Sequence, residues 1–268
     1  MTNSIIKEEI LHIISLRHKN RRLYMKEKKG KPFLAEFALF LIVFSVIAGI
    51  LGYTGYIIGK GDFAKSAPVA NEKNRVLIVD AGHGGIDGGA TGINGRLEKE
   101  LNLEISEKVS LFSNLFGYEV INTRTSDASL GDDAPKGKRK MTDLVKRLEI
   151  ANENSDAVFL SIHMNKFPQE VCRGLQIWYS PNSDMSVRLA NIVKNRVQTE
   201  IQPDNTRDCK KADSSIYLLD RMKNTAVLVE CGFISNKAEC EALCSAEYQQ
   251  KLSACLSYAL LDFTNNVG

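Results

Sequence analysis

Three apolar, β-branched runs of this chain each lead into a residue that can bind a metal ion or a proton. Short runs of this kind, separated by segments of 3.6-residue periodicity, predict buried strands that alternate with helices. This alternation constrains the chain to an α/β fold: a single, mostly parallel sheet flanked by helices on both faces. The runs are residues 76–80, 157–162 and 225–229, and they lead into His83, His163 and Glu230.

The same periodicities predict the elements of the folded part. We expect strands at about 75–80, 118–123, 157–163, 174–180, 215–219 and 225–230, and helices at about 98–115, 141–153, 184–199 and 246–264. Sites in open α/β sheets form beyond the carboxyl ends of the strands. His83, His163 and Glu230 should therefore meet at one edge of the sheet.

A membrane anchor is expected before this domain. Residues 37–58 form a run of 22 residues without a charged side chain, long enough as a helix to cross a hydrocarbon core of roughly 30 Å. Residues 1–33 hold nine Lys and Arg against three Glu, which places this end in the cytosol. We expect a basic cytosolic tail, a transmembrane helix, a linker and an extracytoplasmic domain, at 1–36, 37–58, 59–74 and 75–268.

A cleaved signal peptide is the rival interpretation of the N-terminal region, with residues 67–70 as a small-residue cleavage site. The charged region and the apolar run are both longer than a signal peptide requires, and residues 67–70 lie well beyond the apolar run. The lengths therefore favour an anchor.

The charge balance argues against nucleic acid as a partner. The whole chain has a formal net charge of +3. Once the basic residues and Glu of residues 1–33 are set aside, 26 basic residues remain against 29 acidic ones. The excess of positive charge therefore belongs to the N-terminal tail, where it favours contact with the membrane surface, and it gives no reason to expect nucleic-acid binding by the main domain.

All six cysteines follow the apolar run, so an exported domain could pair them. Their spacing matches no strong metal-binding motif. Cys240 and Cys244, four residues apart on one face of an expected helix, are better interpreted as small buried side chains. The cysteines are Cys172, Cys209, Cys231, Cys240, Cys244 and Cys255.

Two histidines and an acid satisfy the needs of a hydrolytic zinc site, which takes about three protein ligands and leaves one position for water. His83 lies in a glycine-rich turn that allows close approach of a bulky substrate. Glu98 is a candidate carboxylate ligand, although an acid in the first turn of a helix is also explained by the helix dipole. Position alone leaves both interpretations of Glu98 open.

Four motifs in order resemble the zinc-dependent N-acetylmuramoyl-L-alanine amidases of the Amidase_3 family. The resemblance covers residues 75–264. The motifs are Val79-Asp80-Ala81-Gly82-His83-Gly84-Gly85, Glu98-Lys99 with Asn102-Leu103, Ser161-Ile162-His163-Met164-Asn165, and Leu228-Val229-Glu230-Cys231-Gly232-Phe233-Ile234-Ser235-Asn236.

The resemblance implies that His83, Glu98 and His163 bind Zn²⁺ and that Glu230 is the catalytic acid/base. The substrate would be peptidoglycan, cut between the lactyl group of N-acetylmuramic acid and the L-alanine of the stem peptide. Asn165 is a candidate for orienting His163 or the substrate. Arg207 could clamp a carboxylate of the stem peptide or be a solvated loop charge.

The compact, anchored architecture is most similar to the family's spore-cortex subgroup, whose cleavage leads to muramic δ-lactam in sporulation and germination. No wall-binding repeats are present in the sequence, so a localising or activating membrane protein is an expected partner. Three alternatives stay open: a vegetative wall-remodelling amidase, a zinc peptidase acting within the stem peptide, and a non-catalytic wall-binding module. Glu230 counts against the last, because binding alone needs no acid/base residue.

Overall fold

The computed structural model describes residues 42, 44–46, 49 and 75–266. The expected transmembrane helix at 37–58 falls almost entirely outside the described residues, as do the tail and the linker, and their boundaries stay predictions. Within the described ranges, no helix combines the length and the apolar character needed to span a bilayer. Residues 72–268 form a compact unit of their own.

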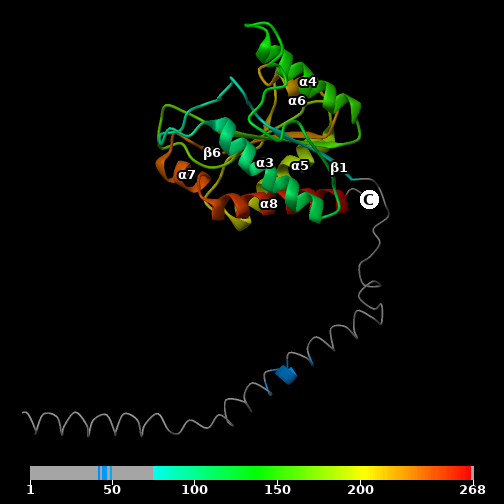
Figure 1. Ribbon diagram of the computed structural model, residues 1–268, viewed down its shortest axis with the longest axis vertical. Coiled ribbons are helices and arrows are strands. Elements are labelled where there is room, and N and C mark those ends of the chain that lie inside the picture. Colours follow the sequence, from blue (N-terminus) through cyan, green and yellow to red (C-terminus); the bar gives the residue numbers. More distant parts are fainter. Residues whose placement is uncertain (1–41, 43, 47–48, 50–74, 267–268) are drawn as a thin grey trace, which may run out of the picture. The chain divides into compact units, whose positions relative to one another are not determined.

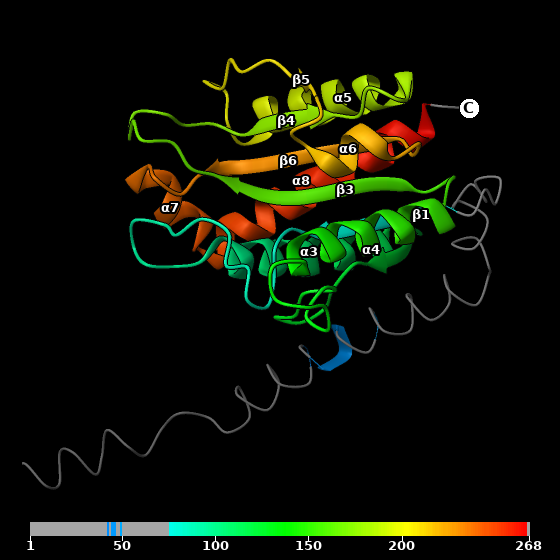
Figure 2. The ribbon, with the colours of Figure 1, turned by 90° about the horizontal axis from the view of Figure 1, so that it is seen from above.

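One six-stranded sheet forms the centre of this unit, in the order β2-β1-β3-β6-β4-β5. Pairing is parallel throughout except between β4 and β6. Figure 2 shows β3 and β6 side by side and running in the same direction. The strands are β1 (Val76–Ala81), β2 (Glu119–Asn122), β3 (Val158–Asn165), β4 (Gln176–Tyr179), β5 (Lys210–Lys211) and β6 (Ala226–Phe233).

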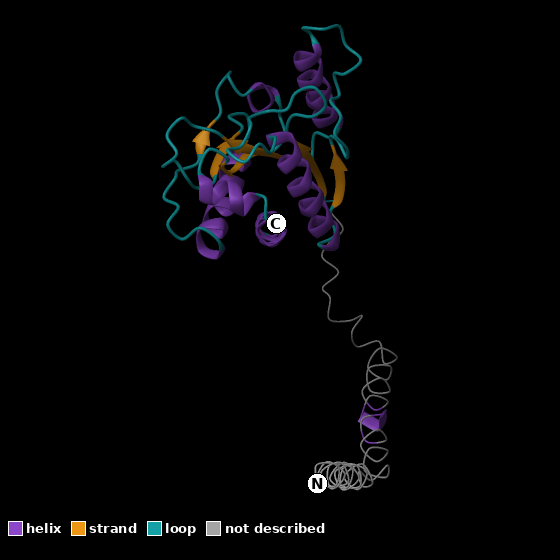
Figure 3. Ribbon diagram, turned by 60° about the vertical axis from the view of Figure 1, so that its left-hand side comes forward, coloured by secondary structure: helices purple, strands orange, loops and turns teal. Residues whose placement is uncertain are grey.

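Helices cover both faces of the sheet, as expected from the alternating pattern (Figure 3). In Figure 1, α4 and α6 lie on one side and α3 and α8 on the other. Alternate residues of β1 show the division, because Leu77 packs in the core with α3, α5 and α8, whereas Ile78 packs in the core with α4 and α6. The helices are α3 (Glu98–Leu115), α4 (Arg139–Glu153), α5 (Asp184–Glu200), α6 (Tyr217–Arg221), α7 (Lys237–Leu243) and α8 (Ala246–Asn265).

Helix α3 illustrates how the sequence produces this packing. Leu101, Ile105 and Val109 recur every four residues and are fully buried, so one stripe of the helix faces the core. Helix α8 repeats the pattern with Leu252 and Leu256. These two stripes hold the first residue of α3 against the sheet, where the site forms.

The expectation of a mostly parallel sheet is refined to a mixed sheet by strand β4. A parallel connection needs a crossover of about a dozen residues or more, usually through a helix. Residues 166–175 between β3 and β4 contain no helix. The chain therefore re-enters the sheet from the edge it has just left, and β4 runs antiparallel to β6.

The expected strand at 215–219 is wrong, because this segment begins the short helix α6. The Asp213 carboxylate accepts hydrogen bonds from the backbone N–H and the hydroxyl of Ser215, at 2.8 and 2.5 Å, and starts a turn. Leu218, Leu219 and Met222 are then buried beside the sheet. The turn at Asp213 and the burial of the apolar residues outweigh the β-like composition here, and the edge strand is Lys210–Lys211 instead.

Candidate metal centre and active site

The turn after β1 presents His83 to the edge of the sheet. His83 has a φ of 62°, and no other non-glycine residue in the described part of the chain has a positive φ. Its Nδ1 lies 2.9 Å from Oδ2 of Asp87. The backbone amides of Gly84 and Asp87 bond to each other's carbonyl oxygens at 3.0 and 3.1 Å, which closes the turn.

Glu98 opens α3 and also faces this turn. Its side chain is buried, with Oε2 accepting the Ala90 amide at 2.8 Å and Oε1 accepting the Met164 amide at 3.1 Å. Glu98 thus occupies the first turn of a helix, yet its carboxylate is directed toward β3 and not toward solvent. The dipole and the site interpretations are compatible at this position.

The three expected ligands form one cluster. The Glu98 Oε1 atom lies 3.3 Å from His83 Nε2 and 3.0 Å from His163 Nδ1. The two imidazole rings meet edge to face with centroids 5.0 Å apart. One possible ligand atom from each of the three residues lies within 4.8 Å of the others, and no other such cluster occurs in the described ranges.

Glycine makes this close approach possible. A Cβ atom at Gly82 would lie 2.2 Å from Nε2 of His163. A Cβ atom at Gly89, where φ is 66°, would lie 2.6 Å from Oε2 of Glu98 and 2.8 Å from Cδ2 of His83. The glycine-rich stretch therefore contributes space for the cluster, as well as backbone freedom.

Glu230 lies beside the cluster because β3 and β6 are paired in register, with His163 opposite Glu230. Its Oε2 is closed off from solvent and has no hydrogen-bond partner among the described residues. Burial raises the pKa of Glu230 to about 6, and the nearby Glu98 carboxylate acts in the same direction while His163 and His83 oppose it. A carboxyl group with this pKa can both take up and release a proton near neutral pH.

Electrostatics within the cluster favour charged ligands. Burial disfavours a charged imidazole, but the hydrogen bonds and negative charge of Glu98 and Asp87 outweigh it and raise the pKa of His83 to about 9. Burial also opposes ionisation of Glu98, yet hydrogen bonds from His163 and His83 hold its pKa well below the usual range. These shifts favour an ionised Glu98 carboxylate beside a protonated His83 in the metal-free protein.

This donor set fits a catalytic zinc ion. Two imidazole nitrogens and a carboxylate are typical zinc ligands, and three protein ligands leave a further position open. The convergence of two ring nitrogens on one carboxylate oxygen is an arrangement that a cation would stabilise. The Asp87 carboxylate contacts the other ring nitrogen of His83, where it orients the imidazole. Asp87 was not predicted from the sequence, although its position four residues after His83 was an available signal.

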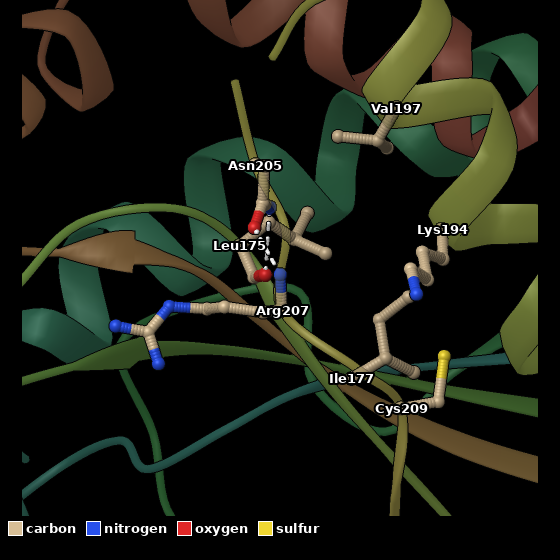
Figure 4. A pocket seen from close by; sticks show the side chains of 7 residues that line it. All are labelled: Leu175, Ile177, Lys194, Val197, Asn205, Arg207 and Cys209. Carbon is tan, nitrogen blue, oxygen red and sulfur yellow. Dashed lines mark hydrogen bonds between the residues drawn. The ribbon is translucent and has the colours of Figure 1, made fainter. Parts of the chain in front are cut away.

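The remaining predicted site residues lie outside this cluster. Asn165 ends β3, two residues beyond His163, and pairs with Phe233 across a register shift. Arg207 lies in the loop before β5, and its guanidinium stacks over the Phe233 ring at 4.7 Å. Figure 4 shows the guanidinium directed away from the other labelled side chains, while the Asn205 side chain accepts a hydrogen bond from the Arg207 backbone amide at 3.1 Å.

A groove of about 720 Å³ adjoins Arg207. Its walls come from the loop between β3 and β4, from residues 201–207 after α5, and from residues that follow β6 in α7 and α8. Arg207 donates from Nε to the Arg173 carbonyl oxygen at 2.8 Å, which orients the guanidinium at the rim. The polar side chains of its lining include Arg173, Asn205, Arg207, Asn236 and Glu239.

The cysteines take no part in the site. All six belong to the described residues and carry free thiols. Cys231 follows Glu230 on β6 and is fully buried in the core, as strand alternation predicts. Burial raises the pKa of its thiol far above the usual range, so it is not a nucleophile.

The fold and the cluster together define a class of protein: an α/β protein with a candidate metal-binding site at the carboxyl edge of its sheet. The sequence pattern of the Amidase_3 family, N-acetylmuramoyl-L-alanine amidase, matches residues 77–262. The chain belongs to this family, which confirms the resemblance seen in its motifs. The family's name states the bond that is hydrolysed, between N-acetylmuramoyl and L-alanine in peptidoglycan.

Individual relatives agree with this assignment. The germination-specific N-acetylmuramoyl-L-alanine amidase of Bacillus subtilis is 29% identical over 247 residues, covering 91% of this chain and 98% of the relative. The amidase LytC of the same organism is 32% identical over 217 residues, covering 76% of this chain and 40% of LytC.

A solved structure is similar over the same region. The CwlD amidase from Clostridioides difficile, determined in complex with the GerS lipoprotein, superposes with a TM-score of 0.69 at 32% identity. The match covers 72% of this chain and all of that chain.

Proposed function

We propose that this chain is a zinc-dependent N-acetylmuramoyl-L-alanine amidase in which His83, Glu98 and His163 hold the metal and Glu230 is the catalytic acid/base. The observation that carries the proposal is the cluster of two imidazoles around the Glu98 carboxylate, with Glu230 in register beside His163. A zinc ion in such a site polarises a carbonyl group and makes water acidic near neutral pH.

Glu230 performs the proton transfers. The attacking water loses a proton to the Glu230 carboxylate as its oxygen bonds to the lactyl carbonyl carbon. Glu230 then returns the proton to the alanine nitrogen as the C–N bond breaks. The products are the lactyl carboxylic acid of the glycan and a stem peptide with a free amino group, so one water is consumed and no other reactant is required.

The substrate peptide is proposed to lie toward the Arg207 groove. Arg207 is anchored by Nε and backed by Phe233, which leaves the two Nη groups of its fork for a carboxylate. Asn165 ends β3 and pairs with Phe233, the residue that Arg207 stacks on. We propose that Asn165 contacts the substrate near the scissile bond.

Removal of the Arg207 guanidinium tests this direction. Arg207→Ala should raise KM for muropeptides by about tenfold with little change in kcat, because a carboxylate contact made equally in the ground and transition states affects binding alone. Arg207→Lys should recover only part of the loss. Steady-state kinetics on a soluble muropeptide measures both, and an unchanged KM for Arg207→Ala would contradict the role.

Proton competition at His83 should make zinc binding pH-dependent. The pKa of His83 is raised to about 9, so near neutral pH His83 is mainly protonated in the metal-free protein and zinc binding must displace this proton. Apparent zinc affinity should rise as pH increases from 6, by up to about tenfold per pH unit for one displaced proton, and level off above 9. Chelator competition at several pH values measures this, and an affinity independent of pH would contradict it.

A role in the spore cortex is proposed for this amidase, leading to muramic δ-lactam. The proposal is supported by the relative named germination-specific. Spores from a strain whose only copy carries Glu230→Gln should lack δ-lactam in their cortex muropeptides. Normal δ-lactam content in such spores would favour the vegetative alternative.

The proposed location is outside the cytoplasmic membrane, with anchoring through residues 37–58. The uncharged run and the basic residues before it support this topology. The CwlD amidase was determined in complex with a lipoprotein, and a membrane-associated partner is proposed for this chain as well. Full-length protein that a high-salt wash releases from membranes would contradict the anchor.

Mass spectrometry of digested peptidoglycan tests the activity itself. Zinc-loaded residues 72–268, the second compact unit of the chain, should release stem peptides that begin at alanine and leave peptide-free glycan. Shortened peptides still attached to muramic acid would identify a peptidase instead. A protein that binds peptidoglycan but releases nothing, with or without zinc, would indicate the binding module.

A further inference from the structure

The turn that presents His83 has an unusual set of contacts. The backbone carbonyls of Ala81, Gly82, His83 and Gly85 all accept hydrogen bonds from side chains that lie outside the turn. His83 itself has a positive φ of 62°, a conformation that residues with a Cβ atom adopt uncommonly. The side chains that donate these hydrogen bonds therefore stabilise the turn.

Arg147, from the middle of α4, is the most buried of these groups. Its Nη2 donates to the His83 carbonyl oxygen at 2.8 Å and its Nη1 to the Ala81 carbonyl oxygen at 2.9 Å. The charge is balanced by Asp80 and by Asp143, the latter bound through Nε at 2.7 Å. The guanidinium is 2% exposed, so this position is enclosed within the protein.

Arg124, in the loop after β2, donates hydrogen bonds to the same turn. It donates from Nε to the Ala81 carbonyl oxygen at 2.9 Å and from Nη2 to the Gly82 carbonyl oxygen at 3.0 Å. The same Nη2 reaches the Lys99 carbonyl oxygen at 2.8 Å, in the first turn of α3 beside Glu98. The Arg124 side chain thus connects the backbone of the His83 turn to the backbone beside Glu98.

Asp80 orients this arrangement from within β1. Its two carboxylate oxygens accept hydrogen bonds from Thr123 at 2.8 Å and Ser161 at 2.6 Å, in addition to Arg147. Ser161 lies on β3 two residues before His163. These hydrogen bonds therefore connect β1, which leads into His83, with β3, which carries His163.

We propose that Arg147 and Arg124 are positioning residues that hold the His83 turn in its metal-binding conformation before any metal is present. They bind backbone carbonyls and act on the metal through the turn alone, and the inference rests on the proposed metal role of His83. Each arginine has a planar fork that bonds two or more carbonyls at once, which a lysine ammonium on a single flexible stem does not reproduce. The metal site is thereby preorganised by two buried cations on the side of the turn away from the ligand atoms.

Conservative substitutions test the proposal. Arg147→Lys keeps the charge for Asp80 and Asp143 but loses the simultaneous hold on Ala81 and His83. Arg124→Lys leaves the Arg147 pairs in place, so it tests the turn independently of that buried ion pair. Arg196→Lys is the matched control, since Arg196 pairs with Asp262 on the outer helices, and Leu219→Ala controls for a general loss of stability.

Two readouts separate positioning from mere stability. The first is zinc affinity of the full domain by chelator competition, together with the visible spectrum of the Co²⁺-loaded protein, which reports coordination geometry. The second is amide hydrogen exchange of the metal-free protein at Gly84 and Asp87, whose amides close the turn. Thermal unfolding identifies the stability change of each variant.

Both arginine variants should bind zinc about 10- to 100-fold more weakly, as outer-sphere substitutions typically do, with an altered Co²⁺ spectrum and exchange at Gly84 and Asp87 faster by about tenfold or more. The two controls should retain wild-type affinity and spectrum. Arginine variants with wild-type affinity and turn exchange would overturn the inference and leave the metal role of His83 intact. A wild-type domain that binds no zinc would instead overturn the proposed function.

Discussion

Glu230→Gln is expected to lower amidase turnover by about 10²- to 10⁴-fold while leaving zinc binding in place. The substitution keeps the size and the buried position of the side chain but removes its ability to take a proton. In the native protein Oε2 of Glu230 has no hydrogen-bond partner among the described residues, although it is buried. A buried acceptor left unpaired is costly, and a reacting water would supply the missing partner.

The measurement is the rate of stem-peptide release by the zinc-loaded domain, with zinc content determined on the same sample. Glu104→Gln is the matched control, because Glu104 is a partly exposed carboxylate on α3 paired with Arg96. The control should retain wild-type turnover. A Glu230→Gln protein with near-normal turnover would show that another group moves the proton.

His163→Ala should abolish both zinc retention and activity. His163 provides one of two imidazole contacts to the Glu98 carboxylate, and a site with only two protein ligands holds zinc far more weakly than one with three. The loss should be large even though His163 is only one residue of a long strand. The folded domain should survive, because the neighbouring core residues Ile162 and Met164 are unchanged and buried.

Zinc per protein after dialysis against a weak chelator measures this effect. The wild-type domain should keep about one equivalent and His163→Ala close to none. Asn165→Ala, on the same strand two residues further on, should keep the wild-type zinc content. Retention of a full equivalent by His163→Ala would exclude the residue as a ligand.

Most of the parallel sheet could be read from the sequence. Buried strands such as β1 and β3 are continuous apolar runs, and their carboxyl ends share an edge by construction. The direction of β4 was also within reach, since residues 166–175 are too short for a helical crossover. The helix at 217–221 was not, because its apolar residues fit a strand and a helix equally well and the Asp213 turn decided between them.

The candidate site likewise contains residues that the sequence predicted and contacts that it did not. His83, His163 and Glu230 were predicted to share one edge of the sheet from their strand ends alone; His83 and His163 belong to one cluster, and Glu230 pairs with His163 in the strand register. Glu98 needed the family resemblance, since its place at the start of a helix had an independent explanation. The surroundings of Arg207 were not predictable, because the stacking partner Phe233 lies 26 residues away on another element.

The sequence by itself determined which chemical groups this protein carries and to which edge of a sheet they are brought. Hydrophobic periodicity is a local property, and strands that alternate with helices favour a parallel sheet whose carboxyl ends share one edge. Only the tertiary structure decided how those groups meet. The 3.0 Å contact between His163 and Glu98 and the hydrogen bond from Arg147 to the His83 turn join residues from separate elements. Contacts of this kind depend on packing between elements, which no local pattern encodes.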